Sequence, residues 1–234
     1  MGLVFAQDMK LDDILEKYFK VNGGDKLEKL QTYKIKGKMH WDAEFQLTTF
    51  AKRPDMERAE MDLEGTRIIV VLTGQTGWMI NPISGFDPQD MDADMIKNNK
   101  KTFGSQKLPF GWNNPLINWK ENGNRIELVG REEMDGTPVY NIKMTFKDNE
   151  VINFYMDQEK FLILKMKDKS IILGQPEEVE VKYSDYREVD GFMIPYNLEI
   201  FHNGSLTITL TFEKIEFNIP VNDTMFIKPV VNRK

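Results

Sequence analysis

The chain has 234 residues, a net charge of −6 at pH 7, two histidines and no cysteine. Its length suits one large mainly β domain with a substantial core. Lysine and arginine are scattered among acidic residues, whereas phosphate binding needs a concentrated basic patch, so nucleic acid is not expected as the main partner. No run of eighteen apolar residues occurs, so no transmembrane helix is predicted.

The first residues resemble the end of a secretory signal. Val4-Phe5-Ala6 has the small-residue pattern after which signal peptidase cuts, and the sequence becomes polar from Gln7. We therefore expect residues 1–6 to be a signal-peptide remnant or tag, cleaved near Ala6 and Gln7. An ordinary apolar N-terminus is the alternative. The remainder, residues 7–234, is expected to form a single domain, because no linker-like or low-complexity stretch divides it.

A short helix is followed by many strands. Residues 8–22 place apolar side chains at three-and-four spacing and end at Gly23-Gly24, which predicts an amphipathic helix. From residue 32 apolar and polar residues alternate, which is the period of a strand with one buried face. Roughly a dozen strands are more than an open sheet usually carries without curling or closing. We predict strands at residues 32–40, 43–53, 56–63, 66–73, 77–81, 124–132, 138–147, 150–157, 160–168, 177–188, 193–202 and 205–217.

Residues 82–123 interrupt the alternation. A short helix is expected between Asp87 and Lys101, and the rest is irregular but rich in large apolar residues. Core packing would explain such residues individually. Because they gather in an irregular segment, we predict that residues 82–123 are an insertion that forms a lid over the open mouth of the curved sheet. The cluster comprises Phe103, Leu108, Phe110, Trp112, Leu116, Ile117 and Trp119.

Groups able to do chemistry are scarce. His40 and His202 have no second metal ligand at a recognisable spacing, and no nucleophile elbow, phosphate-binding loop or dinucleotide fingerprint occurs. Acidic pairs such as Glu132-Glu133 are adjacent on strands, so their side chains point to opposite faces. A pair of carboxylates assembled from distant strands stays open as an alternative. We predict no enzymatic activity, no metal site and no cofactor.

Two strand motifs carry a family resemblance. One strand ends in Lys52-Arg53-Pro54, and residues 69–82 form a Gly-centred hairpin that closes with Trp-x-x-x-Pro. The opening Gly23-Gly24 and the tail Phe217-Asn218-Ile219-Pro220 fit the same pattern. Together these motifs resemble the LolA/LolB-type periplasmic carriers of outer-membrane lipoproteins, over most of residues 10–228.

The resemblance implies a fold and a latch. The fold is an unclosed antiparallel β-barrel of about eleven strands, with helices covering its concave face and a hollow between them that takes acyl chains. In this family the arginine of the Lys-Arg-Pro motif latches the lid by hydrogen bonds to the lid backbone, and Arg53 occupies that position here. The chain is longer than the simplest carriers, mainly in residues 82–123 and the C-terminal half, so its lid chemistry is expected to differ.

We therefore expect a periplasmic carrier that binds lipoprotein acyl chains in a hydrophobic cavity and delivers them toward the outer membrane. Its partners would be lipidated proteins or lipid acyl chains, together with a membrane-anchored acceptor. Two alternatives stay open: a periplasmic sensor or regulator of the same fold that binds a partner protein or lipid signal, and a structural envelope module with a filled core. Strand alternation and the apolar insertion give the expected cavity lining, which is Phe45, Leu47, Met61, Leu63, Trp78, Ile80, Phe110, Trp112, Leu116 and Trp119.

Overall fold

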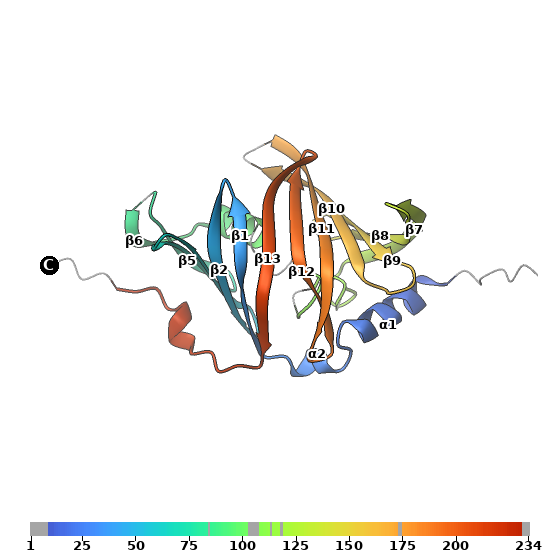
Figure 1. Ribbon diagram of the computed structural model, residues 1–234, viewed down its shortest axis with the longest axis horizontal. Coiled ribbons are helices and arrows are strands. Elements are labelled where there is room, and N and C mark those ends of the chain that lie inside the picture. The colour runs from blue at the N-terminus through green and yellow to red at the C-terminus, as the bar shows by residue number, and fades with distance from the viewer. Residues whose placement is uncertain are drawn as a thin grey trace, which may run out of the picture.

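The computed structural model describes residues 9–83, 85–102, 108–112, 114–117, 119–172 and 175–230. Within these residues thirteen strands form one antiparallel sheet (Figure 1). The predicted signal remnant, residues 1–6, and Phe103 lie outside the described residues. The strands are β1 (Thr32–Trp41), β2 (Ala43–Lys52), β3 (Met56–Leu63), β4 (Thr66–Thr73), β5 (Thr76–Asn81), β6 (Gly85–Asp90), β7 (Arg125–Met134), β8 (Thr137–Thr145), β9 (Val151–Asp157), β10 (Ile163–Ile172), β11 (Gln175–Val189), β12 (Phe192–His202) and β13 (Ser205–Phe217).

The order of the strands leaves the sheet open at one place. The order is β6-β5-β4-β3-β2-β1-β13-β12-β11-β10-β9-β8-β7, so most strands pair with their neighbours in sequence. The exception is the pair β1 and β13, which joins the two ends of the chain at the centre of the sheet. The free edges are β6 and β7, and residues 91–124 connect them. The prediction of a mainly β, unclosed antiparallel sheet is confirmed, with thirteen strands instead of about eleven.

Strand β6 lies in the segment that was expected to break the alternation. It is a short edge strand, which pairs with β5 through Trp78 opposite Asp90, Met79 opposite Gln89, and Asn81 opposite Gly85. It contains a proline, which an edge strand tolerates because the missing N–H faces away from the ladder. Its composition therefore gave no strand signal, and the helix that follows, α3 (Ala93–Thr102), begins later than expected.

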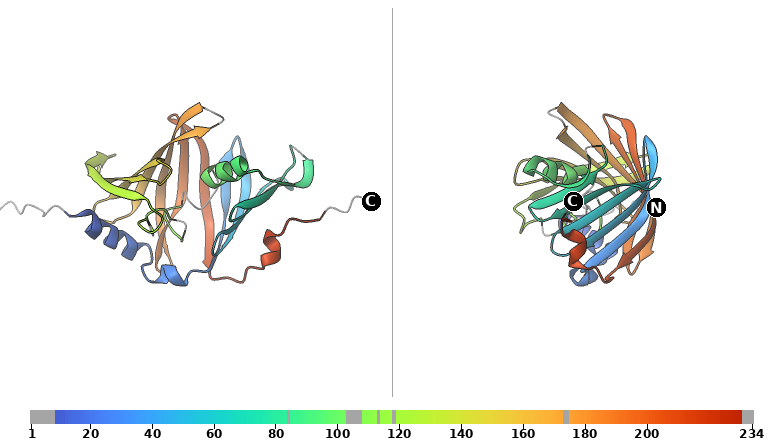
Figure 2. Two further views of the ribbon diagram at one scale, coloured as in Figure 1. Left: turned by 180° about the vertical axis from the view of Figure 1, so that it is seen from behind. Right: turned by 90° about the vertical axis from the view of Figure 1, so that its left-hand side faces the viewer.

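Three α-helices of the described residues accompany the sheet. Helix α1 (Leu11–Val21) buries one face and ends where Gly23 takes a positive φ of 96°. A side chain at Gly23 would meet the ring of Phe192, whose nearest carbon lies 2.3 Å from an ideal Cβ. Helix α2 (Lys26–Lys29) follows directly, and α1 and α2 lie together at one end of the strands (Figure 1). In the side view of Figure 2 the sheet curves around the space that holds α3.

Two apolar clusters occupy opposite faces of the sheet. The main core gathers side chains from α1, α3, most strands and residues 108–116, and it lies on the concave face. A second cluster contains Val71, Trp78 and Phe226, where the 3₁₀ helix η2 (Asp223–Phe226) packs against β4 and β5. The neighbours Trp78 and Met79 belong to different clusters because successive strand residues point to opposite faces.

Candidate functional site

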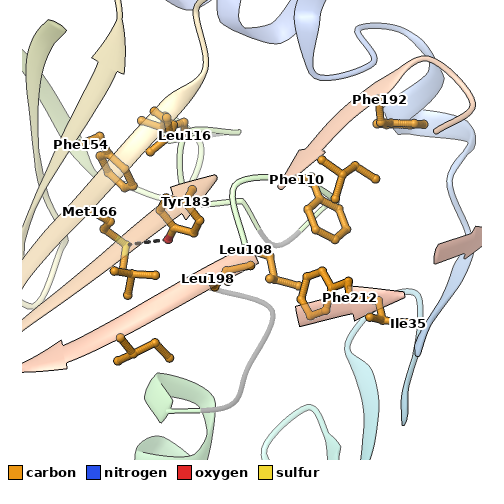
Figure 3. Close-up of a cluster of buried hydrophobic side chains, with 14 of the residues drawn as sticks. Ile35, Leu108, Phe110, Leu116, Phe154, Met166, Tyr183, Phe192, Leu198 and Phe212 are labelled. Carbon is orange, nitrogen blue, oxygen red and sulfur yellow. Dashed lines mark hydrogen bonds between the residues drawn. The ribbon is translucent and has the colours of Figure 1, made fainter. Parts of the chain in front are cut away.

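The concave face is covered by an irregular segment that we call the plug, residues 108–112 and 114–117. Its side chains Leu108, Phe110 and Leu116 are 9%, 1% and 0% exposed. Figure 3 shows them among side chains of the strands, with Leu116 near Phe154. Because the sheet is open between its edge strands, the plug supplies apolar cover that a closed barrel would obtain from its own strands.

A buried polar node joins the plug to α1. The hydroxyl of Tyr18 donates to the carbonyl oxygen of Pro109 at 3.0 Å and accepts a hydrogen bond from Asn114 Nδ2. Tyr18 and Asn114 are 1% and 2% exposed, and Asn114 Oδ1 accepts from the backbone N–H of Leu116 at 3.0 Å. Burial raises the pKa of Tyr18 well above its ordinary value, so its hydroxyl remains a donor. The node fixes the plug to the helix at a point otherwise surrounded by apolar groups.

Arg53 binds the end of helix α2 and contacts the plug residue Trp112. Its Nε donates to the carbonyl oxygen of Leu30 at 2.6 Å, and its Nη2 donates to that of Leu27 at 2.9 Å. Its guanidinium also lies 5.1 Å from the ring centroid of Trp112. The backbone hydrogen bonds therefore go to the end of α2, whereas residues 82–123 were expected to receive them. The plug contacts Arg53 through the Trp112 ring, which also packs against Tyr33 at 5.1 Å between centroids.

The structure brings most of the predicted lining residues to the concave face. Leu47 and Met61 face each other across β2 and β3 and are buried in the main core, as are Phe110 and Leu116. Partly buried side chains also pack against this core, namely Phe45, Trp112 and Trp119. Leu63 is partly exposed at the end of β3.

Trp78 and Ile80 lie on the opposite face, which corrects the prediction for both. Trp78 pairs with Val71 across β4 and β5, and its Nε1 donates to the carbonyl oxygen of Phe226 at 2.9 Å. Alternation correctly placed Trp78 and Ile80 on one face but could not say which face is concave. The apolar residues around η2 could have indicated the orientation of this face, because they need an apolar strand face to pack against.

A cavity of about 580 Å³ lies between α3, the plug with the segment that follows it, the β8–β9 turn, and strands β9 and β10. Such a volume falls within the range of ordinary small-molecule sites. Of the residues predicted to line a cavity, Trp112 lines this one. The strand residues that line the cavity, Ile152, Met166 and Asp168, were not predicted. The apolar lining is Trp112, Pro115, Ile117, Phe146, Ile152 and Met166, and the polar lining is Lys97, Lys100, Asn114, Glu121, Asn122, Asn124, Lys147, Asp148, Glu150 and Asp168.

One buried donor at this site lacks an acceptor. Among the described residues, Nε1 of Trp112 is the buried side-chain nitrogen or oxygen without a hydrogen-bond partner. Buried indole N–H groups usually find an acceptor, and leaving one unpaired costs about 1–3 kcal/mol. The buried Nε1 of Trp112 therefore carries a local energetic cost at the residue that links Arg53 to the cavity.

The described residues hold no group of three or more His, Cys, Asp or Glu placed to bind a metal ion. No helix among them is long and apolar enough to cross a membrane. Several carboxyl pKa values are lowered by hydrogen bonds, at Asp62 from the Gly65 N–H and at Glu178 from Lys167. These carboxyls are held ionised, whereas a general acid needs a raised pKa.

Comparison with known proteins identifies the fold. No protein-family model and no curated protein matches the chain. A LolA superfamily protein from Nitrosomonas europaea is 14% identical, with 94% of this chain and 98% of that protein covered and a TM-score of 0.60. A DUF1329 family protein from Desulfovibrio piger is 13% identical, with 92% and 96% covered and a TM-score of 0.61. A Vibrio parahaemolyticus domain assigned to outer membrane lipoprotein-sorting proteins is 12% identical, with 92% and 94% covered and a TM-score of 0.58. The chain has the LolA-like fold, which confirms the predicted resemblance at the level of the fold.

Proposed function

We propose that this chain is a periplasmic carrier that holds the acyl chains of a lipid or lipidated protein between the concave face and the plug, and delivers them toward the outer membrane. The observation that carries the proposal is the plug itself. The concave face of an open sheet is covered by a separate irregular segment whose apolar side chains are buried against it, and we propose that acyl chains take their place when cargo binds. The fold shared with a lipoprotein-sorting domain supports the same function.

The energetics favour a cover that moves. Acyl chains with about 30 methylenes cost about 24 kcal/mol to hold in water, at about 0.8 kcal/mol per methylene. Full recovery of that energy would exceed the practical ceiling of about 18–21 kcal/mol for non-covalent binding. A carrier must release its cargo, so part of the gain has to be offset. Displacing Leu108, Phe110 and Leu116 would offset about 1.5–3 kcal/mol for each side chain that becomes exposed.

We propose that Arg53 is the latch of this cover. Hydrogen bonds to a charged donor contribute about 1.5–3 kcal/mol when buried, and less for a partly buried arginine such as Arg53. The unpaired Nε1 of Trp112 acts in the opposite direction, since opening would expose it to water. Closed and open states that differ by only a few kcal/mol can be shifted by a ligand that binds one of them.

Two arginine–tryptophan pairs allow a matched test of the latch. Arg53 lies over Trp112 on the concave side, and Arg58 lies over Trp78 on the outer side at 5.6 Å. Arg53→Lys keeps the charge but loses the two-pronged donor, so it should weaken the closed state and raise the apparent affinity for a diacylated lipopeptide several-fold. Arg58→Lys should leave that affinity unchanged. Affinity would be measured by quenching of tryptophan fluorescence during titration.

The carrier proposal itself is tested by what the protein holds. Organic-solvent extraction of protein purified from the periplasm, followed by mass spectrometry, should release acyl species. Absence of acyl species, together with no response to added lipopeptide, would contradict the proposal. Equal affinity for the same peptide without its acyl chains would instead support the regulator that binds a partner protein.

A further inference from the structure

The turns of the antiparallel sheet fall on two opposite rims. One rim carries α1 and α2, while the other, which we call the open rim, carries the turns β1–β2, β3–β4, β5–β6, β8–β9 and β12–β13. Figure 1 shows the β1–β2 and β12–β13 turns at the upper side of the molecule and α1 and α2 at the lower side. Of the helices that the structure describes, α3 contacts the open rim at the β8–β9 turn, where Lys97 Nζ lies 3.6 Å from Glu150 Oε1.

Exposed apolar side chains gather on the open rim. Ile83 and Phe86 at the β5–β6 turn are 93% and 75% exposed, Leu206 after the β12–β13 turn is 52% exposed, and Trp41 at the β1–β2 turn is 48% exposed. Elsewhere in the described chain the large exposed apolar residues lie in the edge strand β7 and in the segment after η2, namely Val129, Ile227 and Val230. Four of the seven large exposed apolar residues of the described chain therefore lie on the open rim.

The charges of the described turns on the open rim do not favour an anionic partner. The described residues of its turns include Asp42, Glu64, Asp148 and Glu150 but a single lysine, Lys147. Two basic side chains just inside the rim are paired, because Lys38 contacts Glu44 at 2.8 Å and Arg67 contacts Asp62 at 2.9 Å. A surface that binds anionic lipid would instead present unpaired lysine or arginine.

The arrangement of the apolar groups favours a bilayer over a protein. They stand on separate turns along a curved rim, whereas a stable protein interface needs about 800 Å² of continuous, well-packed surface on each partner. A bilayer interface accepts separate apolar tips, and tryptophan is enriched at that depth. The β8–β9 turn on the same rim also lines the cavity, through Phe146, Lys147, Asp148 and Glu150. The rim and the cavity are thus continuous.

We propose that the open rim docks on a lipid surface of zwitterionic head groups, with Trp41, Ile83, Phe86 and Leu206 inserted at the interface. Docking in this orientation would bring the cavity mouth to the membrane. It goes beyond cargo binding, because the inserted residues lie outside the cavity lining and outside the plug.

The test uses flotation of the full chain with vesicles of neutral phosphatidylcholine and phosphatidylethanolamine. Wild-type protein should float with these vesicles, with no gain from added phosphatidylglycerol and no loss at high salt. Ile83→Ser and Phe86→Ser should each weaken partitioning about tenfold, as expected when one large apolar side chain leaves an apolar environment. The control Ile227→Ser removes an equally apolar exposed residue away from the rim and should change nothing.

Trp41 gives an independent signal. Its fluorescence should shift to the blue on vesicles and be quenched by brominated acyl chains, and Trp41→Phe should lose this component while still floating. The proposal would be overturned if the protein failed to float on neutral vesicles, or if binding required anionic lipid or were abolished by salt. Equal weakening of partitioning by Ile227→Ser would also overturn it. Binding of a short-chain lipopeptide by Ile83→Ser, measured without vesicles, reports the cavity separately. Loss of docking with retained lipopeptide binding therefore separates the two proposals.

Discussion

Removing the hydroxyl of Tyr18 is the sharpest perturbation of the plug. Tyr18→Phe deletes the donor to Pro109 O and the acceptor for Asn114 Nδ2, while the ring still fills its site in the core. Two buried hydrogen bonds contribute about 1 kcal/mol each, so we expect the closed state to lose about 2 kcal/mol. Because 1.4 kcal/mol is a factor of ten, the open population should rise about thirtyfold.

The assay compares stability with ligand binding. Denaturant unfolding should show a loss of about 2 kcal/mol or less, hydrogen exchange should accelerate in residues 108–117, and apparent lipopeptide affinity should rise. The matched control is Tyr186→Phe, which removes a hydroxyl that donates to Ile163 O in strand β10 instead of to the plug. A fall in stability for both variants with unchanged lipopeptide affinity for Tyr18→Phe would refute the reasoning, since the node would then be structural only.

Three further outcomes are expected. Trp78→Phe loses the donor to Phe226 O, so proteolysis after η2 should accelerate with lipopeptide affinity unchanged; altered affinity would contradict the assignment of Trp78 to the outer face. Stability should fall as pH rises above about 10, because burial raises the folded-state pKa of Tyr18, Tyr183 and Tyr186, so the unfolded state releases their protons first. Tyr18→Phe should make this slope less steep in denaturant titrations, and an unchanged slope would contradict the assignment for Tyr18. Gly23→Ala should lower the free energy of unfolding by at least about 1–3 kcal/mol because of its positive φ and the nearby Phe192 ring, and a wild-type melting temperature would contradict that geometry.

Strand positions could be predicted from the sequence because a half-buried strand imposes an alternating pattern on its own residues. Lys34, Lys36 and Lys38 alternate with Tyr33 and Ile35, and β1 follows that pattern closely. Strand β6 could not be predicted in this way, because it is an edge strand whose residues are mostly exposed on both faces. An exposed edge places few demands on side-chain polarity, so it leaves no periodic signal.

Contacts between distant elements were harder to predict. The Lys-Arg-Pro motif identified Arg53, but its partners at Leu27 and Leu30 depend on how α2 lies against β2. Alternation likewise placed Trp78 and Ile80 on the same strand face without showing which side of the sheet that face is on. The packing of η2, near the C-terminal end of the described residues, determines the side. Which distant residues meet depends on tertiary packing, which local sequence patterns do not encode.

The central claim is that acyl chains lie under the plug on the concave face, and one measurement tests it most directly. A lipopeptide with brominated acyl chains should quench the tryptophan fluorescence of the wild-type protein. Much of that quenching should vanish in Trp112→Phe and persist in Trp78→Phe, because Trp112 lines the cavity whereas Trp78 lies on the outer face. No quenching, or quenching that survives Trp112→Phe and disappears in Trp78→Phe, would contradict the account.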